Sequence, residues 1–165
     1  MQRLPGDDGP SFARVRQLPG AKGPLALSPD GRMLVTGGSD EVIIWEPGSL
    51  KELHRSSGRQ GKIPSRSTVT FSPDGRMAAI PLQTDGRIEV KVWDAGALRE
   101  NGFQQPPVSV LQRGDTEFPV NGMVFSKQAE VLATGQVTIS GNSSFGILRQ
   151  DGRSAHWNRV SRFLT

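Results

Sequence analysis

The sequence contains no cysteine and no tyrosine, and only two of its 165 residues are histidine. Without cysteine, the chain has no disulfide bond, no thiolate metal ligand and no cysteine nucleophile. Neither sign of charge dominates, because 20 lysines and arginines face 16 acidic residues and leave a formal net charge of +4. A charge of this size favours solubility and is only a weak sign of affinity for nucleic acid.

Long hydrophobic runs are missing as well. No segment approaches the roughly 18 consecutive apolar residues of a membrane-spanning helix, and residues 1–8 hold no apolar stretch of signal-peptide length. The sequence therefore predicts a soluble, cytoplasmic protein. Residues 1–10 are rich in Pro, Gly and Asp and are predicted to form a flexible leader before one repeat-built segment at 11–165.

Glycine and proline are abundant, with 20 and 12 residues, and they separate short segments in which apolar and polar residues alternate. Alternation with a period of two is typical of strands, and Gly and Pro favour the turns between them. The composition and pattern together predict an all-β protein.

One phrase occurs twice, at residues 27–36 and 71–80, and includes Ser-Pro-Asp-Gly-Arg-Met in both copies. Each copy leads to an alternating apolar segment that ends in a tryptophan and an acid, at residues 45–46 and 93–94. The two phrases start 44 residues apart. A period of about 40–45 residues with four short strands per unit is typical of a propeller blade. The repeat therefore predicts an architecture without naming a partner.

A third copy is degenerate. Residues 120–126 match the innermost strand of the other copies, but residues 127–130 read Lys-Gln-Ala-Glu where the tight turn is expected. Aligning residues 147–149 with residues 43–45 puts Arg149 at the position of the tryptophan. The sequence thus predicts three four-stranded antiparallel blades at about 21–56, 67–111 and 118–163, preceded by an outer strand at 12–18.

Two details of the second blade differ from the first. Its tryptophan lies four residues later in the repeat, and these extra residues are placed around 82–85. Its outer strand has two candidates, residues 98–103 and residues 108–111, of which the second alternates more clearly.

These residues resemble the WD-repeat family of β-propellers over about 12–163. The resemblance rests on the two Ser-Pro-Asp-Gly turns, on Asp40 and Asp85 ahead of the third strands, and on the two tryptophan-acid pairs. No Gly-His pair precedes any blade, and neither His54 nor His156 fits the family pattern. The two aspartates are therefore expected to hold their turns without the usual histidine, which predicts less rigid blades.

The resemblance implies a rigid platform that binds other proteins or peptides, without chemistry or a cofactor of its own. Three blades do not close a ring, and an open propeller leaves apolar faces and unpaired edges. The chain is therefore expected to belong to a larger propeller or to form a homo-oligomer, such as two chains in a six-bladed ring. In the second case the strand at 12–18 would complete the third blade of a partner chain.

Eight residues are expected to serve the repeat structure itself. The tryptophans are expected to pack between neighbouring blades rather than to anchor a partner, and the aspartates to stabilise turns rather than to pair as catalytic carboxylates. A metal site at the two histidines is not expected, because no cluster of acids or cysteines accompanies them. These structural residues are Asp30, Gly31, Asp40, Trp45, Asp74, Gly75, Asp85 and Trp93.

A basic loop between the first two blades is the candidate partner-binding site, comprising Arg55, Arg59, Lys62 and Arg66. Such a loop can bind an acidic peptide or a phosphate, and its alternative is a solvated loop without a ligand. It lacks interleaved aromatic residues for base stacking, so nucleic acid is not an expected partner.

The predicted function is a non-enzymatic scaffold for protein–protein interaction. The alternative is a piece of a propeller enzyme of the lactonase-like or peptidase-associated kind, whose active site would need inward acids and histidines. The sequence shows no Ser-His-Asp arrangement, phosphate loop or dinucleotide fingerprint, so no catalytic, cofactor-binding or metal-binding residue is assigned.

Overall fold

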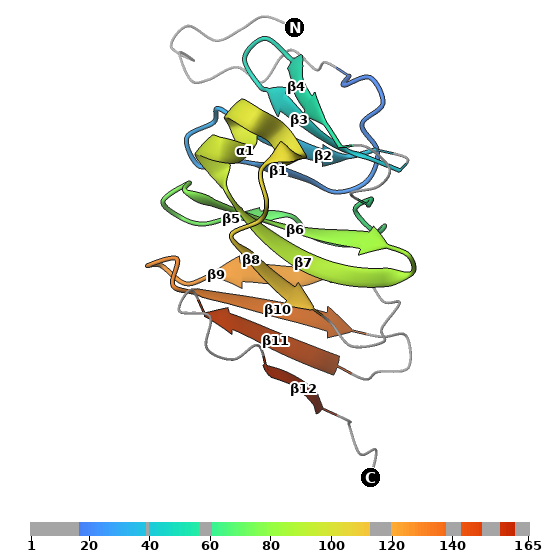
Figure 1. The fold of residues 1–165 in the computed structure, drawn as a ribbon, viewed down its shortest axis with the longest axis vertical. Helices are drawn as coiled ribbons and strands as arrows, with labels where there is room; N and C mark the ends of the chain where they lie inside the picture. The colour runs from blue at the N-terminus through green and yellow to red at the C-terminus, as the bar shows by residue number, and fades with distance from the viewer. Residues whose placement is uncertain are drawn as a thin grey trace, which may run out of the picture.

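The computed structural model describes residues 17–38, 40–56, 61–112, 120–137, 143–149 and 156–160. In these residues the chain forms three four-stranded antiparallel sheets, each made of four strands that are consecutive in the sequence. The sheets are stacked in chain order, with the sheet of β1–β4 and the sheet of β9–β12 at opposite ends of the stack (Figure 1). The predicted all-β class is therefore confirmed, and each sheet is called a blade below.

Blade 1 is built around the first Ser-Pro-Asp-Gly turn. Ser28 Oγ donates to Asp30 Oδ1 at 2.6 Å and accepts from the Met33 amide at 2.9 Å. Gly31 takes a φ of 68°, which glycine adopts without strain. The turn thereby directs the chain back along the first strand. The strands are β1 (Leu25–Leu27), β2 (Leu34–Gly37), β3 (Val42–Glu46) and β4 (Lys51–Arg55).

Blade 2 repeats the turn with Ser72 and Asp74, whose side chains are 2.6 Å apart. Its extra residues lengthen the hairpin between its second and third strands, which pair from Met77 and Asp94 to Thr84 and Arg87. Asp85 and Gly86 close this hairpin with φ angles of 51° and 77°, the signature of a two-residue type I′ turn. The strands are β5 (Thr70–Phe71), β6 (Met77–Thr84), β7 (Arg87–Asp94) and β8 (Ser109–Gln112).

A short helix, α1 (Ala95–Asn101), and a 3-10 turn, η2 (Gly102–Gln104), connect β7 to β8. Asp94 caps the helix by accepting a hydrogen bond from the Ala97 amide at 2.8 Å. The candidate outer strand at 98–103 is therefore wrong, since that segment is mainly helical, and the outer strand is the one predicted at 108–111.

Blade 3 keeps the turn geometry although its sequence has lost the Pro-Asp-Gly. Ser126 Oγ accepts from the Val131 amide at 3.1 Å, and the Ala129 amide donates to the Ser126 carbonyl at 2.9 Å. Ala129 has a φ of 59°, close to the values of the equivalent Gly31 and Gly75. The strands are β9 (Gly122–Phe125), β10 (Val131–Val137), β11 (Ser143–Arg149) and β12 (His156–Val160).

The backbone register corrects the position assigned to Arg149. Trp45 pairs with Leu34 in blade 1, and Leu148 pairs with Leu132 at the equivalent place in blade 3. Leu148, not Arg149, therefore occupies the tryptophan position of the third repeat. The leader at 1–10 and most of the strand predicted at 12–18 lie outside the described residues, and Gln17 and Leu18 are not in a strand.

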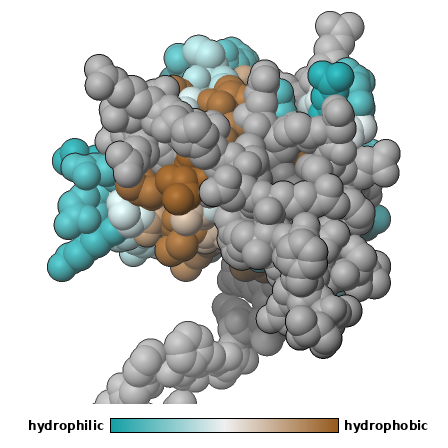
Figure 2. All heavy atoms as spheres, turned by 90° about the horizontal axis from the view of Figure 1, so that it is seen from below, coloured by the Kyte–Doolittle hydropathy of each residue, from teal (hydrophilic) through white to brown (hydrophobic). Residues whose placement is uncertain are grey.

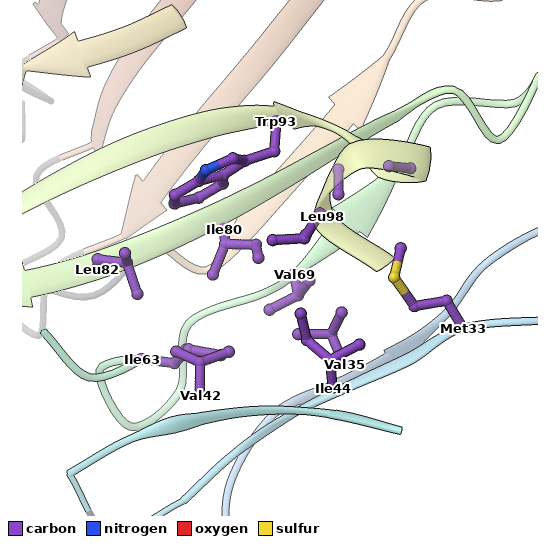
Figure 3. Packing of buried hydrophobic residues seen from close by; sticks show 12 residues of the cluster. Met33, Val35, Val42, Ile44, Ile63, Val69, Ile80, Leu82, Trp93 and Leu98 are labelled. Carbon is purple, nitrogen blue, oxygen red and sulfur yellow. The ribbon is translucent and has the colours of Figure 1, made fainter. Parts of the chain in front are cut away.

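Two hydrophobic cores hold the blades together face to face. The first lies between blades 1 and 2, where Trp93 and Leu98 pack with the aliphatic side chains of both sheets (Figure 3). The second lies between blades 2 and 3 and contains Val92, Met123 and Phe125. Because successive side chains of a strand point to opposite faces, blade 2 supplies one set of residues to each core.

Candidate interaction surfaces

The segment that carries the basic loop connects β4 to β5 and is anchored at several points. Ile63 is buried in the first core, and Lys62 exchanges backbone hydrogen bonds with Gln83 at 2.8 and 3.2 Å. Thr68 donates its amide to the Val120 carbonyl at 2.8 Å, so the same segment reaches the residues that precede blade 3. Its described part is therefore a fixed element of the fold.

Arg55 is held by two acids. It forms ion pairs with Glu41 and with Glu52, the second at 2.6 Å. The hydrogen bonds to Glu52 and then to Glu41 raise the pKa of Arg55 above its ordinary value, and the same bond lowers the pKa of Glu52. The guanidinium of Arg55 is thus committed to contacts within the chain.

The other members of the basic loop differ from one another. Lys62 Nζ lies 3.1 Å from Asp40 Oδ1, so its charge is also paired. Arg66 is exposed, forms no ion pair with another described residue, and has a φ of 66°. Arg59 lies outside the described residues. Two of the four predicted binding residues are therefore neutralised by neighbours, and Arg66 is the described cation that remains available.

Asp30 and Asp74 lie at the tight turns of the first two blades. The hydrogen bond from Ser28 is the main reason that the pKa of Asp30 is below its ordinary value, followed by the bond from the Arg32 amide. Asp74 has a lowered pKa for the same reason, with Ser72 as the first donor. Both carboxylates already accept hydrogen bonds of their own turns.

Asp40 and Asp85 were predicted to occupy equivalent places ahead of the third strands, but their contacts differ. Asp40 pairs with Lys62, whereas Asp85 lies in a type I′ turn.

Both repeat tryptophans are buried. Trp93 belongs to the core between blades 1 and 2 and makes an edge-to-face contact with Phe103, with ring centroids 5.6 Å apart. Trp45 donates its indole N–H to Thr36 Oγ1 at 2.9 Å and lies on the face of blade 1 that is turned away from blade 2. Neither ring is exposed for a partner.

Apolar side chains remain exposed at the blade 3 end of the stack. Val124 on β9 and Ile147 on β11 are 63% and 47% exposed, and both pair with Ala133 on β10, which lies between them. These three residues form one row on the face turned away from blade 2. Figure 2, which views the molecule from this end, shows hydrophobic surface there.

The opposite end of the stack also carries exposed apolar side chains. Leu25 and Leu27 on β1 are 67% and 55% exposed. The outer half of the same face is covered, since Ile43 and Trp45 are buried there. Apolar end faces were predicted from the three-blade repeat, but the residues that form them were not named, although their repeat positions could have identified them.

A cleft of about 550 Å³ lies where the tight turns of blades 1 and 2 approach α1. Two of its arginines lie beside acids, with Arg76 at 4.0 Å from Asp74 and Arg99 at 3.7 Å from Glu46. Because the residues that line the cleft carry both positive and negative charges, the cleft has no strong preference for an anion. The lining residues are Ser28, Asp30, Arg32, Met33, Gly75, Arg76, Asp94, Ala95, Gly96 and Arg99.

Solved structures resemble the fold. A crystal structure of a eukaryotic initiation factor matches with a TM-score of 0.58 and 12% identity, over 88% of this chain and 34% of the other. The β-propeller domain of Cps50 (Swd1) from Myceliophteria thermophila matches with a TM-score of 0.58 and 15% identity, over 84% of this chain and 40% of that domain. The chain is part of a β-propeller. The predicted partial propeller is thereby confirmed, with the described strands supplying three blades.

Sequence comparisons add one relative. No family model matches the chain. Centriole proteome protein 16 of Chlamydomonas reinhardtii is 29% identical over 121 residues, which cover 70% of this chain and 6% of that protein. The propeller segment therefore spans a small fraction of the relative's length.

Among the described residues, no helix is long and apolar enough to cross a membrane. In the same part of the chain, no group of three or more His, Cys, Asp or Glu side chains is placed to hold a metal ion.

Proposed function

We propose that this chain is a WD-repeat-type propeller segment that acts as a non-enzymatic scaffold for protein–protein interaction. The single observation that carries the proposal is the repeat itself: two Ser-Pro-Asp-Gly turns and two buried tryptophans build blades of the same design. The fold that these blades share with the Swd1 propeller domain supports the propeller part of the proposal.

The binding face of the scaffold is proposed to be the edge that carries residues 61–69. The tips of the β2–β3 and β6–β7 hairpins lie at the same edge, as the contacts of Lys62 with Asp40 and Gln83 require. Arg66 and Arg59 are the members proposed to bind an acidic peptide, because Arg55 and Lys62 already have acidic partners.

The wider proposal is that further blades complete the ring, from a second copy or from a longer chain. The cytoplasmic location stays a prediction.

Photo-crosslinking tests this proposal. A photoreactive residue in place of the exposed Ser65, which leaves the neighbouring Arg66 unchanged, is expected to capture a defined protein in cells of the source organism, and the purified partner should then bind saturably at one to one. Arg66→Asn should weaken this binding, because Asn keeps the left-handed backbone while the charge is lost. Arg32→Asn, at the opposite edge, is the matched control.

Two results would contradict the proposed function. One is that no captured protein binds the purified chain saturably. The other is that both arginine variants bind the partner as tightly as the unchanged chain, which would exclude the proposed face.

A further inference from the structure

The three blades can be compared position by position, because Ser28, Ser72 and Ser126 occupy the same place in their turns. The residues three and one positions before each serine lie in the innermost strand or directly before it, on the face turned away from the following blade. In blades 2 and 3 these residues are in the cores or packed against them, whereas in blade 1 they are exposed. They are Leu25 and Leu27 in blade 1, Val69 and Phe71 in blade 2, and Met123 and Phe125 in blade 3.

The faces directed toward the following blade show the same contrast. Val35 and Ile44 of blade 1 are fully buried against blade 2, and Ala79 and Val92 of blade 2 are buried against blade 3. The strand register places Ala133 and Ile147 of blade 3 at the same positions, and there Ile147 is about half exposed. The positions that form the interface between blades 1 and 2, and again between blades 2 and 3, are therefore partly exposed in blade 3.

We infer that a second copy of this chain docks head to tail, with the exposed row of Val124, Ala133 and Ile147 against Leu25 and Leu27 of the copy. The inference rests on the propeller assignment in the proposed function and names the partner of the end faces. Each chain carries both halves of the contact, at the positions that already join blade 1 to blade 2 and blade 2 to blade 3. This continuity with two existing interfaces is the argument for a second copy.

Two such contacts in one pair of chains give a closed dimer with twofold symmetry and leave neither end face exposed. Exposed apolar patches of this kind mark association surfaces on otherwise polar proteins. The outer half of the blade 1 face is already covered at Ile43 and Trp45. On the blade 1 side the contact is therefore made through the innermost strand, and within the chain the innermost strands also meet, β1 with β5 and β5 with β9.

The mass in solution tests the dimer directly. The unchanged chain should show twice the monomer mass of 17.8 kDa by light scattering over a tenfold range of micromolar concentrations. Val124→Asp and Leu27→Asp should each give a monomer, because either change places a carboxylate in the contact. Val108→Asp is the control, since Val108 is 58% exposed and lies outside both end faces. All three replaced side chains are exposed, so melting curves should stay close to that of the unchanged monomer fold.

The absence of native cysteine allows a second test. A chain with both Val124→Cys and Leu27→Cys should form a covalent dimer on mild oxidation, at a yield well above that of either single-cysteine chain. The two positions lie at opposite ends of the stack with blade 2 between them, so a bridge within one chain is excluded (Figure 1).

A monomeric unchanged chain, or a dimer that persists in both aspartate variants, would overturn the inference. Either result leaves the proposed function in place, because that function is tested by partner binding at Arg66. A dimer with the expected mutational pattern and no binding partner would instead contradict the proposed function alone.

Discussion

Ala129 occupies a position that the other two blades assign to glycine. Its φ of 59° lies in the left-handed region, where a Cβ atom is unfavourable, and the surrounding turn hydrogen bonds hold it there. Ala129→Gly is therefore expected to raise the free energy of unfolding by about 1 kcal/mol. Urea unfolding followed by circular dichroism measures the change.

The reverse substitution in blade 1 is the matched control. Gly31 has a φ of 68°, and a Cβ atom added there meets no atom within 4 Å. Gly31→Ala should therefore lower the free energy of unfolding by about 1 kcal/mol through backbone strain alone. A stabilising Gly31→Ala, or a destabilising Ala129→Gly, would show that these turns do not require the left-handed conformation.

The hydrogen bond between Trp45 and Thr36 links two strands inside blade 1. Thr36→Val keeps the shape of the side chain but leaves the buried indole N–H without its acceptor, which should cost about 1–3 kcal/mol. Thr36→Ser keeps the acceptor and should cost less than Thr36→Val. Thermal unfolding of the two variants distinguishes these effects, and a loss in Thr36→Val no larger than that in Thr36→Ser would show that the hydrogen bond contributes no more than the methyl group.

The turn aspartates predict how stability depends on acid. Asp30 and Asp74 have a pKa below the ordinary value in the folded chain, mainly because Ser28 and Ser72 donate to them. Their contribution to stability is therefore present above about pH 4 and is lost as the pH falls through the lower folded pKa. Asp30→Asn with Asp74→Asn should flatten the loss of stability as the pH falls below about 4.

The control for this pH series is Asp85→Asn, because Asn also tolerates the left-handed conformation at that turn. This variant should retain the acid-dependent loss of stability. If the double variant lost stability with the same pH profile as the unchanged chain, the two serine contacts would not be the cause.

At the scale of elements, the three four-stranded repeats could be predicted because their signals are local. Alternating apolar residues and a turn with Pro, Asp and Gly determine a hairpin without distant contacts. The position of α1 could also have been found. Asp94 is a preferred helix cap, and Ala, Leu, Arg and Glu follow it within the next six residues. The apolar residues at 98 and 103 were instead interpreted as a strand.

The contacts of the basic loop could not be predicted from the sequence. Lys62 pairs with Asp40, which is 22 residues earlier and at the tip of another hairpin. Arg55 pairs with Glu41 from the same hairpin region and with Glu52 on its own strand. Such pairs depend on how strands are placed in three dimensions, so a loop that is basic in sequence is partly neutralised in the fold.

Helix α1 and the following turn fasten blade 2 to the outer strand of blade 1. His54 Nε2 on β4 lies 2.9 Å from the Arg99 carbonyl, and Trp93 donates its indole N–H to the Gln105 carbonyl at 3.2 Å. Gly102 packs closely against the same imidazole and has a φ of 61°. The helix therefore extends the contact between the two blades beyond their facing strands.

Gly102→Ala tests this connection. The added Cβ would lie 2.7 Å from His54 Cγ, in a backbone conformation already unfavourable for alanine. We expect a loss of about 2 kcal/mol or more in the free energy of unfolding, from strain and overpacking together. Gly48→Ala is the control, because an added Cβ there meets no atom within 4 Å. Equal stability of the two variants would show that the turn moves away from β4 freely.

At the scale of the whole molecule, blade 2 is the only described blade with a neighbour on both faces. Each blade packs mainly against the blades next to it in the sequence, through the two hydrophobic cores. Linear repeat proteins have the same arrangement, and their stability depends on such nearest-neighbour contacts. The two terminal blades therefore open more readily than the central one. Amide hydrogen exchange at low protein concentration should be slowest at Ile80, Val90 and Val92, and faster in β1 and β12.

This gradient of protection also depends on how the stack ends. In an isolated chain, local opening begins at blades 1 and 3, so their backbone amides exchange before those of blade 2. A ring without ends gives every blade two neighbours and has no place where opening starts preferentially. Raising the protein concentration should therefore slow amide exchange in blades 1 and 3 until its rate approaches that of blade 2, without any substitution in the chain.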